Sequence, residues 1–226
     1  MVSTPPHRTE PTDRPSDAEL LEAWRGGDAD AGERLFARHY RLLKRFFRNK
    51  VGAERVADLI QDTFVASVES RERVQDGSRF RAYLLRIAYH VFCRHLRERS
   101  RGRSKVDLDE VCIEQLDPGA TSVIARVQEQ RLLLEGLRAI PVNYQVVLEL
   151  HYWEDLTTGR IAEVLGVPVG TVRSRLQRAR DALEAAMARI ARSSELLEST
   201  LTRLEDWAAR CGRELGVQVL DGRANA

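Results

Sequence analysis

The stretch that decides the fold covers residues 157–183 and reads TTGRIAEVLGVPVGTVRSRLQRARDAL. Ile161 and Leu165 form an apolar helical face near its start, and Gly166 stands where a helix often ends on a glycine with positive φ. Pro168 suits the first turn of a following helix, because that turn needs no N–H from this position. A short helix, a glycine-bearing turn and a longer helix predict a helix-turn-helix.

The longer helix combines an apolar stripe with a strongly basic polar face. Arginine can contact phosphate or fork onto guanine, and Thr, Ser and Gln can donate to phosphate or to base edges. We therefore predict that the polar face contacts duplex DNA. The apolar stripe is Val172, Leu176, Ala179, Leu183 and Met187, and the candidate DNA contacts are Thr171, Arg173, Ser174, Arg175, Gln177 and Arg178.

A plain solvated face is the alternative for these arginines. Asp181 and Glu184 follow closely enough for helical pairing with Arg178 and Arg180. Arg160 lies in the first turn of the short helix, where a cation opposes the helix dipole. A nearby phosphate would offset that cost, so Arg160 joins the candidate DNA contacts.

The composition excludes several classes of protein. The chain has 226 residues, 43% of them hydrophobic and 31% charged, with a net charge of +2, so attraction to DNA must come from local patches. Three widely spaced cysteines argue against a disulfide framework or a zinc site. No apolar run approaches the roughly 20 residues that span a bilayer, and the proline-rich start is no signal peptide. We expect a cytoplasmic protein without metal or cofactor.

Helical periodicity continues through the rest of the chain, so we predict an all-α fold of two small helical domains joined by a flexible linker. Ser16 and Glu19 fit a capping box that begins the first helix. The expected divisions are a disordered tail over 1–15, a helical domain over 16–100, a linker over 101–121 that is basic and then acidic, a helix-turn-helix domain over 122–190 and a helical extension over 191–226. The extension could pack on the second domain or bind a regulator.

The run LGVPVGTVRSRLQRAR (165–180) resembles the second helix-turn-helix of the sigma-70 family of bacterial RNA polymerase sigma factors, in particular the small extracytoplasmic-function (ECF) type. DLIQDTFV (58–65) is similar to the family segment that docks on the polymerase clamp helices. FRAYLLRIAYHVFCRHLRERSR (80–101) is similar to the helix that meets the promoter −10 element.

The resemblance implies a role for each of these segments. It implies core-polymerase binding by Asp58, Gln61, Asp62 and Phe64, −10 contacts by His90, Arg94, Arg97, Arg99 and Arg101, and −35 contacts by Arg160, Gly170, Thr171, Arg173, Ser174, Arg175, Gln177 and Arg178. Tyr83, Tyr89 and Phe92 add aromatic rings beside the basic run, which suits binding to an opened single strand. The alternative is that these rings belong to the core, and for Phe80 and Tyr83 we favour the core. The implied partners are core RNA polymerase and promoter DNA, with an anti-sigma factor left open as a third.

The sequence also departs from the family pattern. Tyr83 stands where Trp is usual, His90 where Asn is common and Arg94 where Asp is common. The DNA sequence that the family reads at the −10 element therefore cannot be assumed for this chain. Gln145 replaces a common Arg, which removes one implied phosphate contact. Gly159 and Arg160 occupy the end of the usual Ser-x-x-Glu cap, so the capping glutamate is missing.

Three functions compete at this point. The first is a sigma factor that binds core polymerase and directs initiation from −10 and −35 elements. The second is a stand-alone helix-turn-helix regulator, which the lack of a ligand-pocket or phosphoacceptor signature disfavours. The third is an enzyme acting on nucleic acid. No paired carboxylates with metal-ligand spacing, nucleophile triad or glycine-rich phosphate loop supports this third function.

Overall fold

The structure is a computed structural model that describes residues 14–70, 77–99, 107–116, 128–204, 206, 210 and 213. Its first domain contains α1 (Asp17–Arg25), α2 (Ala29–Arg48), α3 (Ala53–Glu69), the 3-10 turn η2 (Gly77–Arg79) and α4 (Phe80–Arg99). After α5 (Ile113–Leu116), its second domain contains α6 (Gln128–Arg138), α7 (Val142–Tyr152), α8 (Thr158–Leu165), α9 (Val169–Ile190) and α10 (Ser194–Thr202). Within these ranges there is no β-strand, so the all-α prediction is confirmed.

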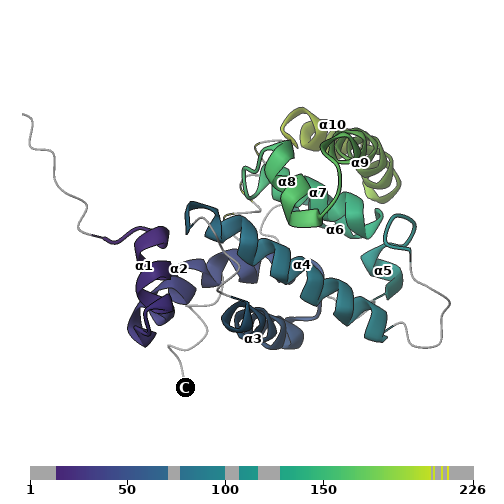
Figure 1. Ribbon diagram of the computed structural model, residues 1–226. Coiled ribbons are helices and arrows are strands. Elements are labelled where there is room, and N and C mark those ends of the chain that lie inside the picture. The colour runs from purple at the N-terminus through teal and green to yellow at the C-terminus, as the bar shows by residue number, and fades with distance from the viewer. Residues whose placement is uncertain are drawn as a thin grey trace, which may run out of the picture.

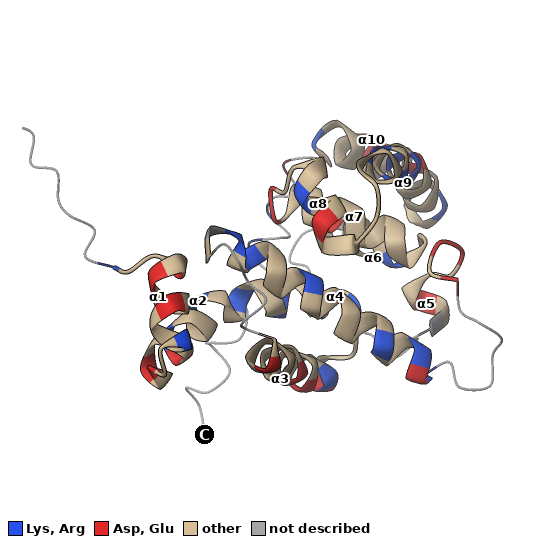
Figure 2. Ribbon diagram, viewed as in Figure 1, with Lys and Arg blue, Asp and Glu red and all other residues tan. Residues whose placement is uncertain are grey.

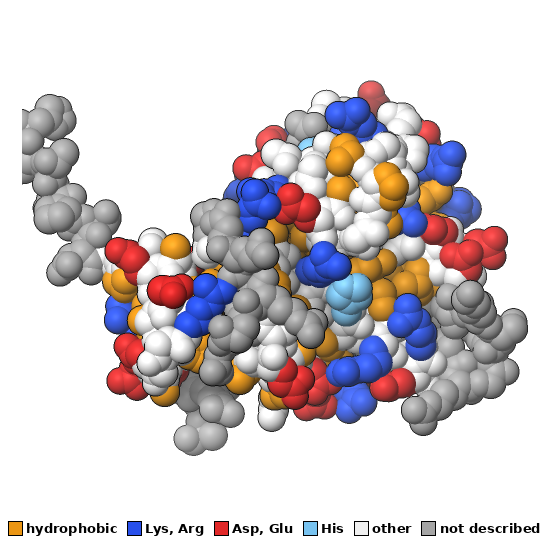
Figure 3. Space-filling model, in the orientation of Figure 1, with side chains coloured by type: hydrophobic (Ala, Val, Ile, Leu, Met, Phe, Trp, Pro, Cys, Tyr) orange, Lys and Arg blue, Asp and Glu red, His pale blue; other side chains and the backbone are white. Residues whose placement is uncertain are grey.

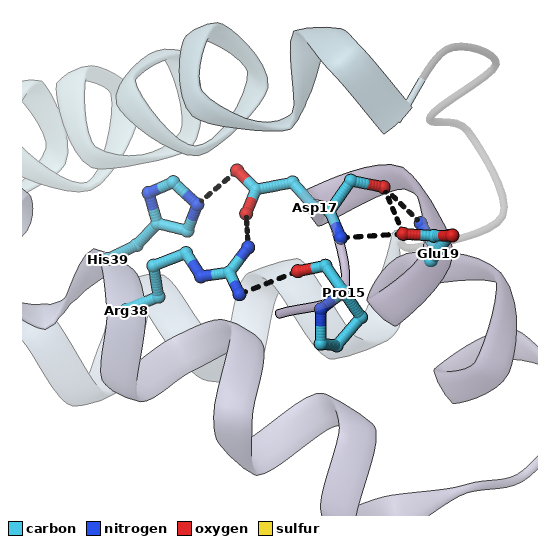
Figure 4. Close-up of polar contacts among 6 residues, drawn as sticks. Pro15, Asp17, Glu19, Arg38 and His39 are labelled. Atoms are coloured by element: carbon cyan, nitrogen blue, oxygen red, sulfur yellow. Dashed lines mark hydrogen bonds and ion pairs between the residues drawn. The ribbon is translucent and has the colours of Figure 1, made fainter. Parts of the chain in front are cut away.

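The capping box predicted at Ser16 is present, and it belongs to a network that fixes α1 against α2. The Ser16 amide donates to Glu19 at 2.7 Å. Asp17 then binds Arg38 at 2.6 Å and the Nε2 of His39 at 2.7 Å (Figure 4). Arg38 also donates to the Pro15 carbonyl at 2.8 Å. The first turn of α1 is therefore held by side chains of α2.

Aromatic rings fill the core of the first domain. Trp24 of α1 packs edge-on against Phe36 of α2 with ring centroids 5.1 Å apart, and Phe36 contacts Phe64 of α3 at 4.5 Å. Phe80 and Phe92 of α4 are fully buried. As Figure 1 shows, α4 runs between α3 on one side and the helices of the second domain on the other.

The second domain packs α6 and α7 against the long helix α9. Gly136 of α6 lies so close to α9 that a Cβ at this position would stand 2.7 Å from Cγ of Met187. Leu196, Leu197 and Leu201 of α10 pack on this core, so the described part of the extension packs back on the second domain. The sequence also predicts that an apolar stripe of the extension continues through Trp207, Ala208, Cys211 and Leu215, and these four residues lie outside the described side chains.

The linker expected over 101–121 is described from residue 107 to 116, and this segment is docked on the second domain rather than loose. Ile113 is fully buried. The amides of Val142 and Asn143 donate to the carbonyls of Val111 and Leu108 at 2.9 and 3.0 Å. The reason is that α7 begins at Pro141 without a side-chain cap, so its first amides need other acceptors. In the domain expected over 122–190, the first described helix begins at Gln128.

Candidate nucleic-acid and polymerase interfaces

The helix-turn-helix has the geometry that its sequence predicts. Gly166 ends α8 with φ at +68°, and Pro168 is the N-cap of α9. Thr157 still caps α8 despite the missing glutamate, because its hydroxyl accepts from the Arg160 amide at 3.4 Å. The predicted apolar stripe of α9 is buried at every position, namely Val172, Leu176, Ala179, Leu183 and Met187.

The opposite face of α9, which we call the recognition face, points largely to solvent. Arg173, Ser174, Gln177 and Arg178 are exposed, and Thr171 is half-buried. A Cβ on Gly170 would meet nothing within 4 Å, so the start of the helix is open. The solvated alternative expected Arg178 and Arg180 to pair with Asp181 and Glu184. Among the described residues those ion pairs do not form.

Two arginines near the recognition face are engaged by carboxylates. Arg175 has a side chain only 14% exposed, and it binds Oδ2 of Asp109 in the docked linker at 2.9 Å. Arg160 pairs with Glu163 within α8 at 2.9 Å. The cation in the first turn of α8 is therefore balanced inside the protein, and a phosphate is not needed to explain it.

The basic segment of α4 is exposed as predicted. His90, Arg94, Arg97 and Arg99 all point to solvent, and Figure 2 shows the basic positions along α4. Burial and the charges of Arg86 and Arg97 lower the pKa of His90. Arg94 binds Asp62 of α3 at 3.1 Å. Arg101 lies outside the described residues.

The aromatic rings expected to stack on an opened strand are not accessible. Phe92 is fully buried and Tyr89 is 8% exposed. Helix α4 packs against both α3 and α8, so the two rings belong to the core and the domain interface. The Tyr89 hydroxyl donates to Asn143 of α7 at 2.8 Å. The prediction of a stacking surface at these two residues is therefore wrong for this conformation.

The acidic residues of α3 form an exposed ridge beside an apolar groove. Asp58, Gln61 and Asp62 are exposed, and Phe64 is half-buried at the edge of the groove. Three of the groove residues were not predicted from the sequence to lie at this site: Trp24, Phe36 and Tyr40. Tyr40 is 42% exposed. In the sequence it lies among the apolar residues that recur along α2, and this position could have indicated that it lines an apolar surface.

A polar seam joins the two domains, and the sequence did not predict it. Glu154, just after α7, accepts from Arg45 of α2 at 2.5 and 2.6 Å and from Arg81 of α4 at 2.6 Å. Lys50 binds Glu149 of α7, and both side chains are at most 3% exposed. We call these five residues the interdomain seam. No local signal marks such pairs, because their members lie 73 to 109 residues apart.

Gln145 also lies in this interface. It is fully buried, and its amide donates to the Asn49 carbonyl at 3.2 Å and to Glu149 at 2.8 Å. The position was expected to face DNA, with Gln145 lacking a phosphate contact that Arg would make. In this conformation the side chain faces the first domain instead, because its amide satisfies buried acceptors there.

Burial shifts the pKa of both members of the buried Lys50–Glu149 pair. It lowers the pKa of Lys50, although the charge of Glu149 opposes this effect. It also raises the pKa of Glu149, against the effects of Lys50 and Gln145. Both shifts arise mainly because the pair is removed from water, and the attraction between the two groups opposes them.

Across residues 14–70, 77–99, 107–116 and 128–204 no group of three or more His, Cys, Asp or Glu could hold a metal ion. Over the same ranges no helix has the length and apolarity required to cross a bilayer. The candidate sites are therefore the recognition face, the basic helix α4 and the α3 ridge with its groove.

Known proteins match both domains. The family model for sigma-70 region 2 matches residues 35–102, and the model for sigma-70 region 4 matches residues 130–183. The ECF RNA polymerase sigma-E factor of Salmonella typhimurium is 27% identical over 177 residues, which cover 75% of this chain and 93% of that protein. The factor of the same name from Haemophilus influenzae is 26% identical over 75% of this chain and 94% of that protein.

A solved structure shares the fold. The structure of CnrH in complex with the cytosolic domain of CnrY has a TM-score of 0.55 and 25% sequence identity, and it covers 77% of this chain and 99% of that one. The two family models together match more than half of the chain. The chain belongs to the sigma-70 family of RNA polymerase sigma factors, within its ECF group.

Proposed function

We propose that this chain is a promoter-specificity subunit that binds core RNA polymerase and directs initiation at promoters with −10 and −35 elements. The supporting observation is the pairing, in one chain, of the exposed basic recognition face of the second domain with the basic helix and the acidic ridge of the first domain. A stand-alone regulator needs the first of these features and has no use for the ridge.

The recognition face is the proposed −35 contact. Arg173, Ser174, Gln177 and Arg178 are exposed on one side of α9 and can reach phosphates or base edges in a major groove. Thr171 and Gly170 lie at the start of the helix, where recognition helices contact bases. Arg175 can join them after it leaves Asp109, and Arg160 after it leaves Glu163.

Helix α4 is the proposed −10 contact, and the α3 ridge is the proposed polymerase contact. Arg94, Arg97 and Arg99 offer donors and positive charge to a DNA backbone, His90 offers a ring N–H, and Arg101 continues the run in the sequence. Figure 3 shows basic side chains gathered over this region of the surface. Asp58, Gln61 and Asp62 offer acceptors to a basic partner, with Phe64 as an apolar contact at the groove.

The proposal includes the setting of this activity. The chain acts in the cytoplasm and carries out no covalent chemistry itself, because the polymerase supplies the active centre. An anti-sigma factor is a further proposed partner, since the solved relative CnrH is in complex with the cytosolic domain of another protein, CnrY.

The decisive experiment is in vitro transcription from a genomic DNA library with purified bacterial core polymerase, with and without the protein. A sigma factor gives new initiation sites without any other sigma factor present, whereas a stand-alone regulator gives none. Asp58→Ala should weaken binding to core polymerase and leave binding to the mapped promoter duplex unchanged, because Asp58 pairs with Arg55 and not with a proposed DNA contact. Arg173→Ala should do the reverse. If both variants impaired the same step equally, the proposed division of roles would be wrong.

A further inference from the structure

Three basic residues in the second half of α2 recur on one side of the helix without an acidic partner. Arg41, Lys44 and Arg48 are three and four residues apart, so their side chains are neighbours on adjacent turns. Arg45, which lies between them in the sequence, binds Glu154. Within the part of the chain that the structure describes, none of the three forms an ion pair or a hydrogen bond. We call these three residues the α2 cluster.

Two members of the α2 cluster are withdrawn from water. Lys44 is only 7% exposed. Arg48 is half-buried, and its Nη1 is buried without a hydrogen-bond partner. Burying a charged donor without an acceptor is costly, and in native proteins such a group marks a place where an ion or a water molecule binds. Arg41 is exposed, so the cluster is open to solvent at one end.

The charges around the α2 cluster are all of one sign. Burial lowers the pKa of Lys44, and the charges of Arg48 and Arg41 lower it further. Burial also lowers the pKa of Arg48. No carboxylate of the described ranges opposes either shift, although the chain has 34 acidic residues for its 36 basic ones. An anion between the three head groups would relieve both the repulsion and the loss of hydration.

The dipole of α2 explains part of this arrangement. Cations are favoured in the last turn of a helix, and Arg48 is the last residue of α2. The effect falls off within one turn, and it provides no acceptor for the buried Nη1. The dipole therefore accounts for the charge at Arg48 and leaves its buried donor unexplained.

The spacing of the α2 cluster sets the size of the anion. From Arg41 to Arg48 the helix rises about 10 Å, at about 1.5 Å per residue. One small ion cannot contact cations spread over this length, whereas two or three linked phosphates can. Each phosphate also offers several acceptor oxygens, which suits the forked donors of arginine and the amine of lysine.

We propose that Arg41, Lys44 and Arg48 form a binding site for a compact polyphosphate anion, such as the phosphate chain of a nucleotide. Lys44 supplies the central charge, and the two guanidinium groups bind phosphates on either side of it. The site is separate from the basic segment of α4, whose Arg94 is bound to Asp62 of α3. It goes beyond the proposed function, because the reading of −10 and −35 elements does not require it.

The first test measures the binding of inorganic tripolyphosphate to the full chain by titration calorimetry, in a buffer without divalent cations. We expect one saturable site in the wild type. Lys44→Met should weaken binding by about tenfold or more, because charge-assisted hydrogen bonds are lost, and Arg48→Gln should weaken it as well. The matched control Arg34→Ala removes an exposed cation of α2 two turns before Arg41, and it should keep the affinity within about twofold.

The stability of the variants distinguishes a binding site from a structural role. Lys44→Met removes a desolvated charge that has no partner, so it should raise the midpoint of urea unfolding when no anion is present. Tripolyphosphate should raise the midpoint of the wild type and leave that of Lys44→Met unchanged. A wild type whose midpoint does not respond to tripolyphosphate would contradict the proposal.

Lysine modification locates the bound anion. Lysine occurs in the sequence only at positions 44, 50 and 105. Tripolyphosphate should slow the acetylation of Lys44 by an amine-reactive reagent, with Lys105 as the internal reference. Equal slowing at both residues would show a diffuse attraction and would overturn the site.

Three further results would also overturn the proposal. They are the absence of saturable binding in the wild type, an equal loss of affinity in Arg34→Ala and Lys44→Met, and equally tight binding of a short single-stranded DNA at the same lysine. The last result would identify the α2 cluster as an additional nucleic-acid surface. None of them affects the proposed function, which is tested by initiation with core polymerase.

Discussion

The Nζ of Lys50, just after the second helix of the first domain, donates to the carboxylate of Glu149 in the second domain, and neither side chain is more than 3% exposed. Burial lowers the pKa of the first group and raises that of the second. A buried pair of this kind stabilises weakly as a pair, but loss of one partner is costly. It therefore makes the packing of the two domains on each other sensitive to single substitutions.

Replacing one member of this pair should open the chain. Lys50→Met leaves the Glu149 carboxylate buried without a cation, which costs about 3–5 kcal/mol if the domains stay packed. Opening returns Glu149 to water, so we expect unfolding in urea to split into two transitions. The double variant Lys50→Met, Glu149→Leu should restore one transition at the wild-type urea concentration or above. A double variant as unstable as the single one would contradict this account.

The two arginines on the recognition face should respond differently to salt. Arg173 is exposed, so Arg173→Ala should reduce the slope of log affinity against log salt concentration for duplex DNA by about 0.9. Arg175→Ala should change the slope less, because DNA must first displace Asp109 from Arg175. Fluorescence anisotropy between low and moderate salt measures both slopes. Binding to core polymerase serves as the control and should be unchanged in both variants.

Gly166 should be the least replaceable glycine of the helix-turn-helix. Its φ of +68° is a left-handed conformation, so Gly166→Ala should lower the free energy of unfolding by about 1–2 kcal/mol. Gly170 makes the matched control, because a Cβ there meets nothing within 4 Å and its φ is not positive. Gly170→Ala should leave the stability unchanged or raise it by up to about 1 kcal/mol. Urea unfolding of both variants measures these changes. Equal losses of unfolding free energy in the two variants would contradict the prediction.

His39 should make the first domain sensitive to acid. Burial lowers the pKa of His39, although Asp17 opposes this effect, and the charges of Arg38 and Arg81 add to it. A lowered pKa means that the unfolded chain takes up the proton first. The contribution of His39 to the free energy of unfolding is therefore fully present above the ordinary histidine pKa. It is lost as the pH falls through the lower folded-state pKa.

The measurement for His39 is the free energy of unfolding across about pH 7.5 to 5, where one proton contributes at most about 1.4 kcal/mol per pH unit. His39→Gln should flatten this dependence in part. The remaining slope includes His90, whose pKa is also lowered. If the variant and the wild type lost stability in parallel, His39 would not be the group responsible.

The sequence predicted those features of the structure that local chemistry decides. Ser16 and Glu19 cap α1 as expected, because a capping box needs residues only three positions apart. Gly166 and Pro168 set the turn between α8 and α9 for the same reason. The alternation of apolar and basic residues along α9 decided which side is buried, and the exposed side carries Arg173 and Arg178 as predicted.

The features that depend on the placement of the two domains were not predictable. Gln145 and Glu149 lie on α7 in a pattern that also suits a helix facing solvent, and nothing near them in the sequence indicates Asn49 or Lys50 as partners. The basic neighbours of Tyr89 predicted a stacking surface, but its hydroxyl reaches Asn143 across the interface. Periodicity identifies an apolar face, and it does not say which surface covers that face.

The burial of Cys112 in the docked linker makes its rate of alkylation a measure of how often the linker detaches. This thiol is 9% exposed and lies in the linker beside Pro141, where the backbone forms an isolated antiparallel bridge. A bulky alkylating reagent can reach the sulfur at an appreciable rate only while the linker is detached. The rate at which the peptide containing Cys112 gains mass in a timed quench would therefore report how often the linker lifts, without any label or substitution in the natural chain.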